Sequence, residues 1–123
     1  MIAQLDKLKE NFELIPVCPE QLGGLSTPRA PSEIIGGNVI NSEGTDVTEF
    51  FIAGAEITHI TATKNRCKLC LLKERSPSCG VHQIYSGDFS GSLINGAGVT
   101  TALLLENGFK VFSEEEIDLL LNY

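Results

Sequence analysis

Basic residues are scarce in this sequence: 9 Lys and Arg stand against 16 Asp and Glu, for a formal net charge of -7. Because a nucleic-acid footprint needs a basic face, we expect no nucleic-acid partner, although a small basic pocket is compatible with this charge. No apolar run approaches the roughly 18 residues that span a bilayer. Residues 1–10 also lack the apolar core of a signal peptide. We therefore expect a cytoplasmic protein with no membrane partner.

The rest of the composition is that of an ordinary globular protein. Apolar residues make up 42% of the chain and charged residues 20%, which argues against disorder. A length of 123 residues predicts a single domain over residues 1–123 with one feasible core. In a reducing compartment, the four cysteines are buried thiols, metal ligands or redox groups rather than a disulfide framework. They are Cys18, Cys67, Cys70 and Cys79.

Strands alternate with helices along the predicted chain. The expected elements are a helix over 2–12, a strand over 13–17, a hairpin over 33–44, a helix from Thr45 or Asp46 to about Lys64, a strand over 67–73, a helix over 99–107, a strand over 109–112 and a final helix with a Ser113–Glu116 capping box. This order predicts an α/β fold, a small three-layer sandwich with a mostly parallel sheet of three or four strands flanked by helices.

Two loops rich in glycine and proline follow predicted strands, and each carries a cysteine. The first begins Cys18-Pro-Glu and extends to Pro31; the second begins Ser76-Pro-Ser-Cys-Gly and extends to Gly98. Ligands of parallel sheets bind beyond the carboxyl ends of the strands, so we expect Cys18 and Cys79 to meet there. Each thiol is a candidate metal ligand or nucleophile, and the alternative for each is an incidental cysteine in a turn or at a strand end.

Three polar residues in these loops are further candidates. Glu20 is a general acid or base if its pKa is shifted, or else a solvated loop carboxylate. Arg29 is the cation best placed for an anionic substrate group, and its alternative is a surface salt bridge. Asp88 lies in Ser-Gly-Asp-Phe-Ser-Gly, where it either lines the binding site or, the favoured interpretation, forms a turn.

The remaining two cysteines form a Cys67-Lys-Leu-Cys70 motif. Because it falls on a predicted strand, where residues three apart point to opposite faces, we expect the sheet to separate the two thiols. This position favours two buried cysteines over a metal or redox pair.

Several motifs together resemble one family. They are Val17-Cys-Pro-Glu-Gln-Leu-Gly-Gly-Leu-Ser-Thr-Pro-Arg29, Gly44-Thr-Asp-Val-Thr48, Leu72-Lys-Glu-Arg-Ser-Pro-Ser-Cys-Gly80, Ile84-Tyr-Ser-Gly-Asp-Phe-Ser-Gly91, Gly96-Ala-Gly-Val-Thr-Thr101 and Val111-Phe-Ser-Glu-Glu115. The chain resembles the domain of unknown function 523 family, whose characterised members are thiouracil desulfidases.

The resemblance implies an iron–sulfur enzyme that hydrolyses a C–S bond of a thiolated pyrimidine nucleobase. In the family, three cysteines hold a [4Fe-4S] cluster whose fourth iron stays open to the sulfur of the substrate. Cys18 and Cys79 match two of the three ligand positions. Glu20, Ser76 and Ser78 lie in the same motifs, which makes them candidates for catalytic acid–base or positioning roles.

The chain departs from the family at one point. Family members usually open with a short strand and a Cys-Leu-Leu-Gly loop that supplies the third cysteine, and this sequence has no counterpart. We expect either a chain truncated by a misassigned start at Met1 or a degenerate, inactive member, with the cluster absent or unstable. A missing strand also exposes a sheet edge, which favours a homodimer.

Three functions follow in order of preference. The first is an iron–sulfur-dependent desulfidase of thiolated pyrimidines or a shortened relative of one. The second is a non-catalytic protein that keeps the fold without the cluster. The third is a small-molecule binding domain that uses Arg29 and the glycine-rich loops.

Overall fold

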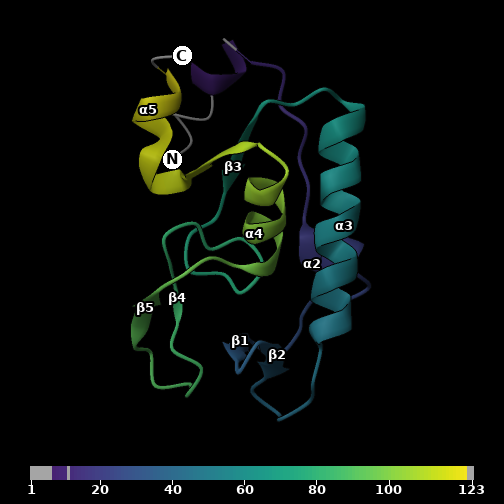
Figure 1. Ribbon diagram of the computed structural model, residues 1–123, viewed down its shortest axis with the longest axis vertical. Coiled ribbons are helices and arrows are strands. Elements are labelled where there is room, and N and C mark those ends of the chain that lie inside the picture. The colour runs from purple at the N-terminus through teal and green to yellow at the C-terminus, as the bar shows by residue number, and fades with distance from the viewer. Residues whose placement is uncertain (1–6, 11, 122–123) are drawn as a thin grey trace.

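A computed structural model describes residues 7–10 and 12–121 (Figure 1). Residues 7–10 are helical, which confirms that part of the predicted N-terminal helix; residues 2–6 and 11 lie outside the described residues. The elements that follow are α2 (Pro19–Leu22), β1 (Ser32–Ile35), β2 (Asn38–Asn41), α3 (Thr48–Lys64), β3 (Leu69–Leu72), β4 (Gln83–Tyr85), β5 (Leu93–Asn95), α4 (Val99–Glu106), β6 (Lys110–Ser113), the 3-10 turn η1 (Glu114–Glu116) and α5 (Ile117–Leu121).

The strands form three two-stranded sheets. β3 pairs with β6 in parallel, whereas β1–β2 and β4–β5 are antiparallel hairpins. The mixed α/β class is therefore correct, but the three-layer sandwich around a sheet of three or four mostly parallel strands is wrong for the described residues. Two segments account for the difference. Residues 13–17 are extended without a strand partner, and the second predicted loop folds into the β4–β5 hairpin.

The predicted first hairpin and long helix are confirmed. Gly36 and Gly37 turn the β1–β2 hairpin with positive φ angles of 57° and 85°, the conformation that two-residue hairpin turns need. At the start of α3, the Asp46 carboxylate accepts hydrogen bonds from the Thr48 backbone N–H at 2.9 Å and the Thr48 hydroxyl at 2.6 Å. The predicted cap is nevertheless wrong: Val47 stands at the N-cap position without a side-chain cap bond, and Asp46 lies one residue before it.

Three apolar clusters hold these elements together. Their buried members are Leu72, Cys79, Val81 and Leu104 in the first, Leu8, Ile117 and Leu120 in the second, and Val39, Val47 and Phe51 in the third. The first cluster joins β3 and α4 to the loop that carries Cys79, so that loop is anchored in the core. α3 and α4 pack against each other (Figure 1). None of the helices in the described part of the chain is long and apolar enough to cross a bilayer.

Candidate functional site: two cysteine loops

The first cysteine loop is fixed by close packing of α2 on α3. Cys18 precedes α2, and its carbonyl accepts the Leu22 N–H at 2.9 Å. A Cβ on Gly23 would lie 1.8 Å from the carbonyl oxygen of Phe50, and a Cβ on Gly54 would lie 1.9 Å from that of Pro19. Only glycine permits this backbone contact, which seats the Cys18 loop directly on α3.

The second cysteine loop is closed by its own serine. The Ser76 hydroxyl accepts hydrogen bonds from the backbone N–H groups of Ser78 and Cys79, both at 3.1 Å. The Gly80 N–H donates to the Ser76 carbonyl at 2.8 Å. Hydroxyl–backbone bonds of this type organise tight turns, and here they hold the backbone of Cys79 in place.

The first turn of α4 also forms hydrogen bonds with the Cys79 loop. The Thr100 N–H donates to the Ser78 carbonyl at 2.8 Å, and the hydroxyls of these two residues are 2.8 Å apart. The Thr101 hydroxyl donates to the Cys79 carbonyl at 2.9 Å. Thr100, Thr101 and Ser78 are all fully buried, so this network is shielded from competing water.

The two loops meet, as the sequence predicts. Burial raises the pKa of the Cys79 thiol to about 11; its bond to Ser78 opposes the rise, and charges on Glu20 and Cys18 add to it. Cys79 therefore lies within the electrostatic reach of Glu20 and Cys18, since such effects fall with distance. The Arg29 Nε donates to the Glu20 carboxylate at 3.0 Å. The site therefore combines two thiols, one carboxylate and one guanidinium.

Arg29 is held at this site by several partners. Its guanidinium also bonds to the Thr27 hydroxyl at 3.0 Å and the Ser26 carbonyl at 3.3 Å. Burial opposes the charge, but Glu20 and Cys18 more than compensate and hold the pKa of Arg29 above its ordinary value. The salt bridge foreseen as an alternative is present, and it holds the cation beside Glu20 and Cys18.

The other candidates from the sequence occupy different environments. The hydroxyls of Ser76 and Ser78 are engaged in the loop bonds described above, with Ser78 fully buried. Asp88 accepts hydrogen bonds from the hydroxyls of Ser86 and Ser90 in the β4–β5 hairpin, as the favoured turn interpretation requires. No described bond joins Asp88 to either loop cysteine. The catalytic and substrate-binding roles of these residues stay predictions.

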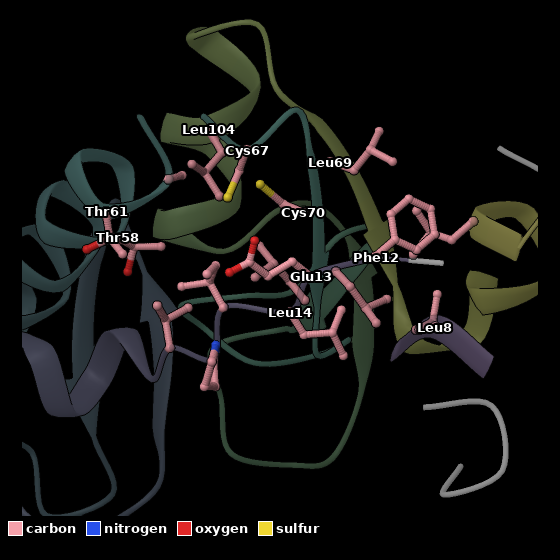
Figure 2. Close-up of a pocket in the computed structure, with 17 residues that line it drawn as sticks. Leu8, Phe12, Glu13, Leu14, Thr58, Thr61, Cys67, Leu69, Cys70 and Leu104 are labelled. Carbon is pink, nitrogen blue, oxygen red and sulfur yellow. The ribbon is translucent and has the colours of Figure 1, made fainter. Parts of the chain in front are cut away.

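The expected separation of Cys67 and Cys70 is wrong. Both thiols line one apolar groove, and Figure 2 shows their sulfur atoms pointing into the same space. The reason is local: β3 begins only at Leu69, and Arg66 has a left-handed φ of 56°, so strand alternation does not apply to Cys67. Burial, with a smaller contribution from Cys67, raises the pKa of Cys70 to about 11.

The groove lies between residues 13–17 and β3. Each of these segments has a side with no strand partner among the described residues. About 310 Å³ in volume, it is lined by residues of 12–17 and of β3, with Thr58, Thr61 and Leu104 among the rest (Figure 2). β6 is the one ladder partner of β3 among the described strands, and Leu14, Ile15 and Val17 are each 38% exposed. Val17 directly precedes Cys18, and Leu72 packs against Cys79. Two lining residues of the groove, Val17 and Leu72, therefore adjoin the cysteine loops, while Cys18 and Cys79 themselves do not line it.

Fold and site together define an α/β protein with two cysteine loops converging on one polar cluster. Residues 2–116 match the family model described as 2-thiouracil desulfurase. The chain is 43% identical over 125 residues to the uncharacterized protein YbbK of Bacillus subtilis (strain 168), covering 94% of this chain and 83% of that protein. The solved structure of the [4Fe-4S]-dependent thiouracil desulfidase TudS matches this chain with a TM-score of 0.89 and 43% identity. The match covers 96% of this chain and 80% of the TudS chain.

The chain belongs to the 2-thiouracil desulfurase family. A cubane cluster with one open iron needs three thiolates converging on one face. Cys18 and Cys79 would supply two, and the described residues contain no group of three or more His, Cys, Asp or Glu side chains that could hold a metal. The described residues therefore do not by themselves fit the cluster.

Sequence reasoning missed one buried acidic residue at this site. Glu74 follows β3 and is only 4% exposed. Its partners are backbone N–H groups, which leave no side-chain pattern in the sequence that could have identified it.

Proposed function

We propose that this chain carries the substrate site of a desulfidase that acts on thiolated pyrimidines. The observation that carries the proposal is the Glu20–Arg29 ion pair in the Cys18 loop, whose Glu20 and Cys18 lie within electrostatic reach of the Cys79 thiol. Family membership supports it, as does the 43% identity to the [4Fe-4S]-dependent thiouracil desulfidase TudS.

The polar pair suits the edge of a pyrimidine ring. A carboxylate accepts hydrogen bonds and a guanidinium donates them, so Glu20 would take a ring N–H and Arg29 would donate to an exocyclic oxygen. In the overall reaction, water supplies oxygen to the ring carbon, the C–S bond breaks, and sulfur leaves as hydrogen sulfide. Ion pairing fixes both side chains before the substrate arrives, which reduces the ordering needed on binding.

The third thiolate is the missing part of this proposal. We propose that it enters on an added strand seated in the groove between residues 13–17 and β3. Two features support this placement. The groove offers apolar side chains together with backbone that has no ladder partner on that side among the described residues, and its lining includes Val17, which precedes Cys18. An added strand would pair with the free edge of β3, as extended segments do at open sheet edges.

Sulfide release tests the function. Both the 123-residue chain and a version preceded by an apolar strand and a Cys-Leu-Leu-Gly loop are incubated anaerobically with iron and sulfide, desalted, and given 2-thiouracil. The extended version is expected to release sulfide, and Cys18→Ser or Cys79→Ser is expected to abolish release. A serine in place of the added cysteine is the matched control.

One outcome distinguishes the desulfidase from the second candidate function, a binding protein without turnover. If the extended version binds 2-thiouracil but releases no sulfide with a full cluster, the desulfidase proposal fails and the non-catalytic function replaces it. If Cys18→Ser and Cys79→Ser both retain turnover, the site itself is assigned to the wrong residues.

A further inference from the structure

One carboxylate oxygen gathers the backbone on both sides of the Cys79 loop. Glu74 Oε1 accepts hydrogen bonds from the backbone N–H groups of Val81 at 2.7 Å, His82 at 2.9 Å, Gln83 at 3.1 Å and Arg75 at 3.3 Å. Burial opposes ionisation of this carboxyl, but the four donors more than compensate and hold its pKa below the ordinary value. A buried carboxylate with several N–H donors is a strong local tie.

The tie closes the loop at its base. Glu74 precedes Ser76–Gly80, and the N–H donors Val81, His82 and Gln83 follow it, so the segment carrying Cys79 is bounded at both ends by one side chain. A parallel bridge between Arg75 and Ile84 brings the same two ends together in the backbone. The geometry of the loop therefore depends on Glu74 as well as on the Ser76 turn.

Three consecutive acidic residues, the Glu114–Glu116 row, contact the residues at the base of the Cys79 loop. Glu114 accepts the Glu74 N–H at 2.6 Å, Glu115 pairs with Arg75 at 3.2 Å, and Glu116 lies 2.8 Å from the ring Nε2 of His82. Glu116 also accepts the Ser113 N–H, completing the capping box of η1. Each member of the row thus contacts a residue at the base of the Cys79 loop.

We propose that Glu74 is a positioning residue for Cys79, held in turn by the Glu114–Glu116 row. The inference rests on the proposed function for its significance, because it concerns one of the two site thiols. Glu74 touches neither thiol by any described bond; it acts through the backbone of Val81, His82 and Gln83. Loosening this tie should free the Cys79 loop and leave the Cys18 loop, which is seated on α3, unchanged.

Thiol alkylation tests the proposal and needs neither a cluster nor a thiopyrimidine. The reduced 123-residue chain is treated with iodoacetamide, and the rates at Cys79 and Cys18 are followed separately by peptide mass spectrometry. Cys79 is only 8% exposed, so its rate reports opening of the loop. For Glu74→Ala we expect the ratio of the Cys79 rate to the Cys18 rate to rise roughly tenfold. Glu74→Gln keeps one acceptor oxygen and should give a smaller rise.

Glu33 provides a matched control. It is also buried, and its carboxylate accepts the N–H groups of Gly87 and Phe89 in a different loop. Glu33→Gln should lower the free energy of unfolding without changing the rate ratio. Equal rate ratios for Glu74→Gln, Glu33→Gln and the natural chain would overturn the proposal, as would a parallel rise at both cysteines. If Glu74→Ala does not fold, the comparison of the two glutamine variants decides alone.

The two proposals fail separately. An unchanged rate ratio removes the role of Glu74 and leaves the desulfidase proposal intact. A raised ratio without sulfide release from the extended version leaves Glu74 as the residue that places Cys79 and removes the proposed reaction.

Discussion

Around the two site thiols, small residues decide the backbone path. Gly98 is the clearest case because a Cβ there would lie 2.4 Å from the carbonyl carbon of Ser78 and 2.7 Å from the backbone nitrogen of Cys79. Its φ of -70° is open to any residue, so the need for glycine is one of space rather than of backbone conformation. The closeness of the Cys79 loop to α4 therefore depends on this single missing side chain.

Gly98→Ala should destabilise the protein by about 3 kcal/mol, since the backbone of a packed loop has little room to move. Urea denaturation measures the loss. Gly91→Ala is the control: nothing lies within 4 Å of a Cβ there, and its φ of 85° carries a strain cost of only about 1 kcal/mol. Equal losses for the two variants would show that the Gly98 contact is not tight.

Acid should weaken the native state through Glu74. Its folded pKa lies below the ordinary value of 4.5, so its contribution to stability is present above pH 4.5 and is lost as the pH falls through the folded value. The urea midpoint of the natural chain should therefore drop on acidification below pH 4.5. Glu74→Gln should show a shallower drop, with the remaining slope from groups such as Glu116, whose pKa is also lowered. Identical slopes in the two proteins would contradict this account.

At the scale of elements, local signals were sufficient where the partner was local. The Gly36-Gly37 turn, the course of α3 and α4, and the Ser113–Glu116 capping box were all predicted from spacing and are present. Such signals depend on nearby residues, and that is why they can be read from one sequence.

Elements whose form depends on distant partners were not predictable. β4 and β5 are three residues each and pair across a serine-rich loop, so no alternation long enough to indicate strands exists. The 13–17 segment has strand-like composition but no ladder partner in the described chain, and composition alone does not supply one. The role of Glu74 was equally hidden, because its partners are backbone N–H groups rather than side chains.

Ser113→Ala should cost about 1 kcal/mol of unfolding free energy, because the Ser113 hydroxyl accepts the Glu115 N–H at the start of the C-terminal helical segment. Ser42→Ala, at an exposed position before α3, is the matched control and should change stability by less than about 0.5 kcal/mol. Thermal or urea unfolding compares them. If both substitutions are neutral, the capping box does not stabilise the fold.

For the whole molecule, the groove beside β3 is the feature that distinguishes this protein from a simple small domain. Leu14 lines it and is 38% exposed. Leu14→Asp should therefore lower the stability of the 123-residue chain by only about 1 kcal/mol, the loss of a partly buried apolar side chain. In the version with the added strand, the same carboxylate would be buried without a partner and should lower stability by several kcal/mol. Equal effects in the two versions would mean that the strand does not occupy the groove.

In our proposal, Cys18 and Cys79 are two of the three ligands of a cluster that the described residues do not complete. The most direct measurement is iron bound per chain after anaerobic reconstitution with iron and sulfide, with absorbance in the iron–sulfur charge-transfer region as the second readout. We expect the 123-residue chain to retain no stoichiometric cluster after desalting. The version extended by the apolar strand and its cysteine is expected to retain one. A full cluster on the 123-residue chain, with sulfide released from 2-thiouracil, would contradict it.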